Sequence, residues 1–155
     1  KAKTFRLGIA WAGNSRFRQD QFRSATVELF LPLTKLPNVT LYSLQVGAIV
    51  GTKTLLEDKI IDCAPHLTDF AQTAAAVSHL DLIISVDTSV AHIAGALGRP
   101  TWTLLHSSPD WRWMHQGETT AWYPTMRLFR QTQLGQWDHV SQAITSALSD
   151  LITRK

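Results

Sequence analysis

The sequence predicts an α/β domain with an open parallel sheet and helices on both faces. Short apolar runs alternate along the chain with segments of helical pattern. The central run Leu82–Val86 is almost wholly apolar, which indicates a strand buried on both faces. The length of 155 residues suits a single domain, and an apolar fraction of 45% is enough for one sizeable core.

Six strands are expected, because six short apolar runs are each bounded by glycine, proline or polar residues. The first ends at Gly13, and the second follows a turn at Pro37-Asn38. Strands that alternate with helices belong to one parallel sheet in this architecture. The six predicted strands are Leu7–Trp11, Val39–Leu44, Ile60–Cys63, Leu82–Val86, Thr101–Leu105 and Arg127–Arg130.

Helices are expected where a capping residue precedes apolar positions at helical spacing. Asp69 is predicted to cap a helix through Leu80, with Phe70, Ala74 and Val77 on one face. Asp87 is predicted to cap the next helix, which Gly98 ends. Asp138–Ile152 is predicted to be an amphipathic helix. Ser24 or Thr26 can cap a helix through Val27–Leu31, which Pro32 is expected to shorten. Gly47–Asp58 is predicted to form a loop and a short helix.

Charge is concentrated at the beginning of the chain. The net charge of +3 is too small to indicate nucleic-acid binding. The first 23 residues contain six basic residues and a single acidic one, Asp20. Such a stretch either attracts a phosphate-bearing ligand or is a solvated loop, and charge alone favours neither interpretation. Its basic residues are Lys1, Lys3, Arg6, Arg16, Arg18 and Arg23.

Cys63 is the single cysteine, so no internal disulfide can form. No stretch approaches the ~18 apolar residues of a membrane span, and the N-terminus carries no signal-peptide pattern. We therefore expect a cytoplasmic protein. The abrupt beginning at Lys1 suggests a fragment of a longer polypeptide.

The candidate ligand site follows the strand Leu82–Val86. In open parallel sheets, ligands bind beyond the carboxyl ends of the strands. The first-turn amides at Thr88 and Ser89 lack intrahelical partners, and with the helix dipole they favour a diphosphate. His92 lies one turn along on roughly the same face as Thr88. The alternative is that Asp87 is merely a helix cap and His92 a packing residue.

The loop after the first strand is the second candidate segment. Its glycines have Walker A spacing, but Asn14 stands where the lysine belongs and no helix follows, so a P-loop is excluded. Gly13 permits close approach of the backbone to a ligand, and Arg23 or Arg18 supplies the countercharge. We expect Arg23 to be an exposed loop residue that contributes little to folding.

The aromatic loop after Thr101–Leu105 is the third segment. Trp111 and Trp113 either stack on a base or sugar, or wedge the loop onto the sheet; packing is favoured for Trp122 and Tyr123. The sequence has no Asp-x-Asp pair, HExxH or GxSxG motif, so neither a metal site nor a nucleophile is expected.

The stretch Val86–Pro100 resembles the family nine glycosyltransferases, the ADP-heptose:lipopolysaccharide heptosyltransferases, whose pattern is Asp-Thr-Gly, about three residues, then His-Leu-Ala-x-Ala-Leu-Gly-x-Pro. Pro109–Trp113 and Trp122–Arg130 are similar to a related group in which such a domain follows tetratricopeptide repeats. The resemblance extends from about Arg6 to Leu151. Ser89 stands where the family has glycine, and a side chain there crowds the donor.

The resemblance implies one half of a GT-B enzyme, built as a Rossmann-like domain that binds a nucleotide diphosphate sugar without metal. It places Arg23 where the family has a donor-binding lysine, and it matches Asp87, Thr88, Ser89 and His92 to the turn that holds the diphosphate and sugar. The catalytic base would lie in the missing N-terminal domain, leaving no catalytic residue in residues 1–155. The alternative is a non-catalytic module that keeps the fold and docks to repeats or partner proteins.

Overall fold

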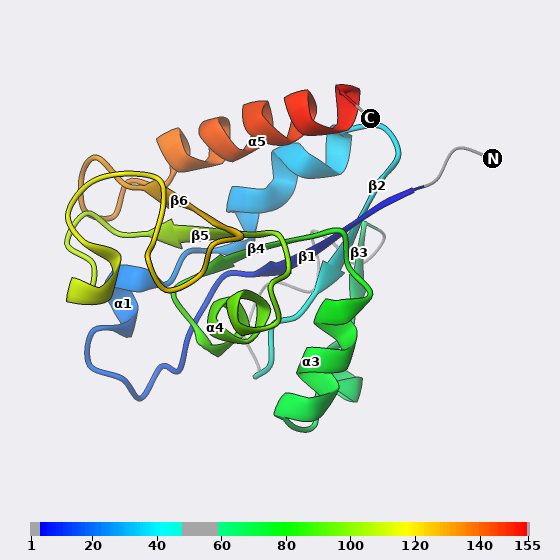
Figure 1. Cartoon of the computed structure of the whole chain (residues 1–155), viewed down its shortest axis with the longest axis horizontal. Helices are drawn as coiled ribbons and strands as arrows, with labels where there is room; N and C mark the ends of the chain where they lie inside the picture. The colour runs from blue at the N-terminus through cyan, green and yellow to red at the C-terminus, as the bar shows by residue number, and fades with distance from the viewer. Residues whose placement is uncertain (1–3, 48–58, 155) are drawn as a thin grey trace.

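The computed structural model describes residues 4–47 and 59–154. They form one six-stranded sheet in the order β3-β2-β1-β4-β5-β6, and all five neighbouring pairs are parallel (Figure 1). The Rossmann-like fold predicted from the sequence is confirmed. The strands are β1 (Phe5–Ala10), β2 (Val39–Ser43), β3 (Ile60–Asp62), β4 (Leu82–Val86), β5 (Thr101–Leu105) and β6 (Met126–Arg130).

Helices cover both faces of the sheet. The long helix α5 (Asp138–Thr153) and the 3-10 helix η1 (Val27–Lys35) lie together on one face, and α3 (Phe70–Ser78) and α4 (Ser89–Ala96) lie on the other (Figure 1). Each face has its own apolar cluster. The alternate side chains of β4 divide between the two, since Ile84 packs toward η1 and α5, whereas Ile83 packs toward α3 and α4. The shorter helical turns are α1 (Asp20–Arg23), η2 (Ala64–His66) and η3 (Trp111–Trp113).

The order of the strands reverses in the middle of the sheet. The chain leaves β1 toward β2 on one side, and it leaves β4 toward β5 on the other, while β1 and β4 are hydrogen-bonded neighbours. Loops that leave such a pair in opposite directions open a crevice beyond the carboxyl ends of the strands. The fold therefore places the first loop and the turn after β4 side by side.

Most element boundaries agree with the sequence predictions. β4 and β5 have the predicted bounds, and Asp69 caps α3 by accepting a hydrogen bond from the Gln72 amide at 2.8 Å. Gly98 follows the last turn of α4 with a φ of +63°, as a helix-ending glycine should. Of the predicted segment Gly47–Asp58, all but the first residue lies outside the described residues.

Phe70 lies in the first turn of α3 and is 70% exposed, whereas Val77 at helical spacing from it is buried. Two predictions about helices are wrong. The segment after Thr26 is a nine-residue 3-10 helix that continues through Pro32 to Lys35. Finally, α4 begins at Ser89 with Thr88 as its N-cap, so Asp87 lies one position too early to be the cap residue.

No helix within residues 4–47 and 59–154 has the length and hydrophobicity needed to cross a membrane.

Candidate functional site

A cavity of about 620 Å³ opens beyond the carboxyl ends of β1, β2 and β4, at the point where the strand order reverses. The first loop contributes Gly13 and Arg23 to its wall, and the beginning of α4 contributes Thr88 and Ser89. These four residues come from two of the segments that the sequence singled out. Apolar and polar residues after β2 and around the beginning of α3 complete the wall, among them Leu44, Gln45, Val46, Leu67, Asp69, Phe70 and Thr73.

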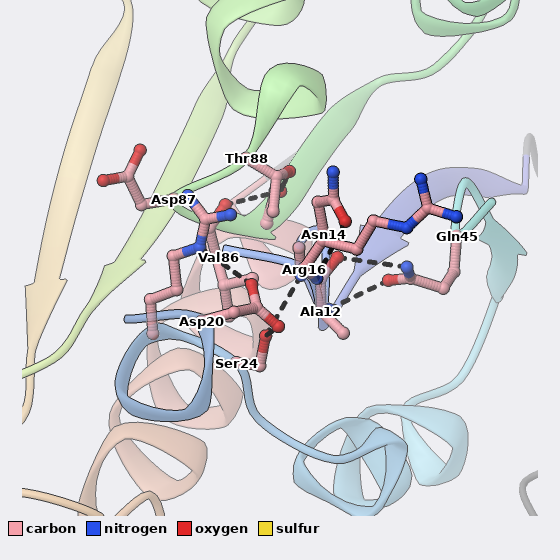
Figure 2. Close-up of polar contacts among 12 residues, drawn as sticks. Ala12, Asn14, Arg16, Asp20, Ser24, Gln45, Val86, Asp87 and Thr88 are labelled. Atoms are coloured by element: carbon pink, nitrogen blue, oxygen red, sulfur yellow. Dashed lines mark hydrogen bonds and ion pairs between the residues drawn. The ribbon is translucent and has the colours of Figure 1, made fainter. Parts of the chain in front are cut away.

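The first loop is held in shape by a chain of hydrogen bonds. The Gly13 amide donates to Ser24 Oγ at 3.1 Å, and that hydroxyl donates to Asp20 Oδ2 at 2.9 Å. Arg23 Nε donates to the other oxygen, Asp20 Oδ1, also at 2.9 Å. Figure 2 shows Asp20 and Ser24 facing each other below the loop. Arg23 thus reaches the cavity wall from a fixed position.

Glycine at position 13 is required by this arrangement. A Cβ atom there would lie 2.4 Å from Asp20 Oδ1 and 2.5 Å from Arg23 Nη2. Both atoms belong to a paired carboxylate and guanidinium whose side chains are 11% and 21% exposed, so neither can easily move aside. The prediction that Arg23 is an exposed loop residue is therefore wrong, because the guanidinium is paired with a buried acid and also lies 4.8 Å from the centre of the Phe17 ring.

Gln45 clamps the beginning of the first loop, a role that the sequence did not reveal. Its side chain is buried at the end of β2; Oε1 accepts hydrogen bonds from the amides of Trp11 and Ala12 at 3.0 and 2.9 Å, and Nε2 donates to the Ala12 carbonyl at 3.0 Å. Figure 2 shows Gln45 reaching across to Ala12. A polar side chain directly after an apolar strand is the one signal that could have identified it.

The turn after β4 leaves the beginning of α4 without a side-chain cap. The Thr88 hydroxyl, on the N-cap residue, lies 3.2 Å from Ser85 Oγ, which itself donates to the Val86 carbonyl at 2.8 Å. Thr88 therefore donates to Ser85 and does not accept from the helix. Within the described residues, no side chain accepts a hydrogen bond from the amides of Ser89 and Val90, which line the cavity.

The Asp87 carboxylate lies on the far side of this turn. Figure 2 shows it pointing away from Asn14 and Thr88. Oδ2 accepts a hydrogen bond from Trp113 Nε1 at 2.9 Å, and Oδ1 lies 3.3 Å from His92 Nε2. Burial by itself raises the pKa of Asp87, but the hydrogen bonds from His92 and Trp113, together with the positive charge of Arg23, outweigh it and hold the pKa below its ordinary value.

His92 connects Asp87 to the aromatic loop. Its Nδ1 lies 2.9 Å from the Tyr123 hydroxyl, and its ring packs 5.5 Å from Trp113 and 5.8 Å from Tyr123 between ring centres. A neutral imidazole with its proton on Nε2 satisfies both contacts, since Nε2 then donates to Asp87 and Nδ1 accepts from Tyr123. His106, at the end of β5, also belongs to this neighbourhood: burial lowers its pKa, as does the charge of Arg23, whereas the charge of Asp87 opposes the shift.

The two tryptophans proposed for stacking do not line the cavity. Trp113 is 1% exposed and packs in an apolar cluster with Leu105 and Met126, so its ring faces are covered and packing is its role. Trp111 is 71% exposed, and its ring centre lies 6.2 Å from that of Trp122 in an edge-on arrangement. Its ring is accessible to solvent but lies outside the cavity lining. Packing is confirmed for Tyr123, whereas Trp122 remains 56% exposed.

The groups that meet at the cavity are chemically suited to an anion. A guanidinium, uncapped helix amides and the exposed Ser89 hydroxyl meet at one cavity. The helix dipole adds partial positive charge at the same end. In the described part of the chain no group of three or more His, Cys, Asp or Glu side chains is placed to hold a metal ion.

An open parallel α/β domain with a cavity at the point where the strand order reverses has the architecture of the Rossmann-like folds. Residues 50–148 match the model of glycosyltransferase family 9 (heptosyltransferase). Since this match covers more than half of the chain, the chain belongs to glycosyltransferase family 9.

Three known proteins are similar. Protein FlbA of Caulobacter vibrioides is 29% identical over an alignment 155 residues long, and the aligned part covers 94% of this chain and 25% of that protein. The structure of E. coli ADP-heptose lps heptosyltransferase II superimposes with a TM-score of 0.63 at 16% identity, covering 99% of this chain and 48% of the other. The glycosyl transferase family 9 protein from Veillonella parvula gives a TM-score of 0.57 at 14% identity, covering 96% and 39%. This chain therefore spans less than half of each of these proteins, and the two superpositions show the shared fold.

Proposed function

We propose that this chain is the donor-binding half of a glycosyltransferase, and that its cavity binds the diphosphate of a nucleotide diphosphate sugar. The observation that carries the proposal is the meeting of Arg23 with the uncapped beginning of α4 in one cavity at the switch point. Membership of glycosyltransferase family 9 supports sugar transfer as the reaction. The volume of about 620 Å³ falls within the range of small-molecule sites.

In this proposal the domain acts on the leaving group. Negative charge grows on the diphosphate as the bond to the sugar breaks. The Ser89 and Val90 amides and the Arg23 guanidinium are fixed before the reaction, so they stabilise that charge without reorganisation. The acceptor and the catalytic base are proposed to lie in a second domain, and no metal is required. The 155-residue chain alone should then show no turnover.

Titration calorimetry with pyrophosphate, ADP, UDP, GDP and sugars linked to these diphosphates tests the proposal. Binding of at least one nucleotide diphosphate is expected, with pyrophosphate competing for the same site. If none of these ligands binds, the donor-binding proposal fails.

A non-catalytic docking module is the second candidate. It is favoured by the exposure of Trp111, Trp122 and Met114, which are 71%, 56% and 69% exposed on the aromatic loop. Ser89, where the family has glycine, also favours it, since a side chain is added to the lining of the cavity. Failure of every nucleotide to bind, together with loss of a partner interaction in Trp111→Ala, would support this reading.

A further inference from the structure

Asp87 directly precedes Thr88, the N-cap of α4, yet its carboxylate accepts no hydrogen bond from the first amides of the helix. An aspartate before a helix commonly accepts hydrogen bonds from the amides two and three residues on, which here are those of Ser89 and Val90. Its carboxylate instead turns along the flank of the helix toward Trp113 and His92. Two donors outside the turn therefore compete successfully with the amides of the helix.

One of these two contacts comes from the aromatic loop, and the other comes from His92 of α4, which the loop contacts through Tyr123. Trp113 bonds the carboxylate directly through Nε1, and Tyr123 bonds it indirectly, through the 2.9 Å contact of its hydroxyl with His92. The neighbouring candidate for a cap is also occupied, since the Thr88 hydroxyl is bound to Ser85. The first amides of α4 are thus left without a side-chain acceptor by two separate arrangements.

The aromatic loop is itself fixed to the sheet. Trp113 is buried between β5 and β6 residues, and the Tyr123 ring lies against Gly95, where a Cβ atom would approach a ring carbon to 2.5 Å. Arg130 at the end of β6 donates hydrogen bonds to the carbonyls of Trp113, Met114, Gln116 and Gly117. The loop therefore presents Trp113 Nε1 and the Tyr123 hydroxyl at defined positions.

We propose that Trp113 and Tyr123 are positioning residues for the diphosphate site: they hold the Asp87 carboxylate off the beginning of α4, so that the Ser89 and Val90 amides stay open to a diphosphate. This inference rests on the proposed function for the identity of the ligand. Without the bond from Trp113, and with His92 no longer held by Tyr123, the carboxylate would rotate onto the amides. It would then occupy the donors and place a negative charge beside the phosphates.

A measurement without ligand tests the positioning itself. Amide shifts of Ser89 and Val90 are followed by ¹⁵N NMR as the pH is lowered from about neutral through the carboxyl range. In the parent, neither amide should follow the titration of Asp87. In the double variant Trp113→Phe/Tyr123→Phe, both amide protons should shift downfield as the carboxylate ionises, since it then accepts from them. Tyr123→Phe alone keeps the ring on Gly95 and should show a smaller shift of the same sign, which answers the question if the double variant does not fold.

A binding measurement tests the consequence. Pyrophosphate should bind the double variant about fivefold to tenfold more weakly than the parent, because a competing carboxylate must first leave the helix. Adding Asp87→Ala to the double variant should restore the affinity to within about twofold of the parent, a rescue that lost packing cannot explain. Trp111→Phe is the matched control, since Trp111 lies in the same loop and makes no bond to Asp87.

The two failures are distinguishable. If the amides of Ser89 and Val90 ignore the Asp87 titration in both variants, or if the added Asp87→Ala rescues nothing, the positioning inference is overturned. If the amides respond as expected but the parent binds no pyrophosphate, the positioning stands and the proposed function falls.

Discussion

Replacing Arg23 with alanine separates ligand binding from folding at the cavity. The guanidinium contributes to both, because it lines the cavity and also bonds Asp20 at 2.9 Å. Arg18 is the matched control: it lies in the same basic loop, is exposed, and does not line the cavity. Arg18→Ala should change neither property appreciably.

The size of both effects follows from the contacts. A charge-assisted hydrogen bond to a phosphate contributes on the order of 1.5–3 kcal/mol, so Arg23→Ala should weaken diphosphate binding by about tenfold to a hundredfold. The free energy of unfolding should fall by about 1–3 kcal/mol, because the Asp20 carboxylate, whose side chain is 11% exposed, loses one of its donors. The bond from Ser24 remains and keeps the loss within that range.

Urea denaturation measures the stability of the parent and both variants, and calorimetry with ADP and pyrophosphate measures affinity at a temperature where all three are folded. Lysine at position 23 restores the charge but not the forked geometry, so Arg23→Lys should recover part of the affinity. Unchanged diphosphate affinity in Arg23→Ala, with the parent binding normally, would refute the role given to this residue.

Four further outcomes are expected. Gly13→Ala should disturb the Asp20–Arg23 pair and weaken diphosphate binding, whereas Gly8→Ala, whose Cβ would press on Leu80 and Leu44 side chains, should lower only stability; calorimetry and denaturation compare the two. The pKa of Asp87 is lowered in the folded state, so the ionised carboxylate stabilises the fold above the ordinary pKa of 3.8, and this stabilisation is lost as the pH falls through the folded-state pKa. The stability of Asp87→Asn should therefore be less sensitive to acid than that of the parent. EDTA should leave nucleotide affinity unchanged; a collapse would mean that a metal participates. Sugar transfer by the isolated chain would contradict the placement of the base in another domain.

The sheet could be predicted from the sequence because its signals are local. β4 and β5 are bounded by turn residues and carry apolar side chains within five consecutive positions, and the Asp69 cap acts within three residues. The cavity wall was predicted in part for a similar reason. Gly13, Thr88 and Ser89 lie within three residues of the ends of β1 and β4, and the topology of a parallel sheet brings such positions to one edge.

The remaining features depend on contacts distant in sequence. Asp87 has the local pattern of a cap, but its partner Trp113 is 26 residues away, and no periodicity reports that contact. The same contact buries Trp113, which the sequence left open as a stacking residue. Gln45 reaches the Ala12 backbone across 33 residues. Arg23 looked exposed because its pairing with Asp20 depends on a short helix, α1, within a polar loop.

The position of Arg130 has a consequence for the order in which parts of the chain fold during synthesis. This arginine fastens carbonyls of residues 113–117, yet it is synthesised after all of them. A nascent chain that emerges only as far as β5 already has the strands that border the cavity, but it lacks the side chain that secures the aromatic loop. In such an intermediate the Asp87 carboxylate is free to accept hydrogen bonds from the first amides of α4, and the docking of β6 would exchange that local bond for the distant one. C-terminal truncations that end before position 130 should then differ from those that end after it in the environment of the Ser89 amide, although position 130 is distant in sequence from that amide.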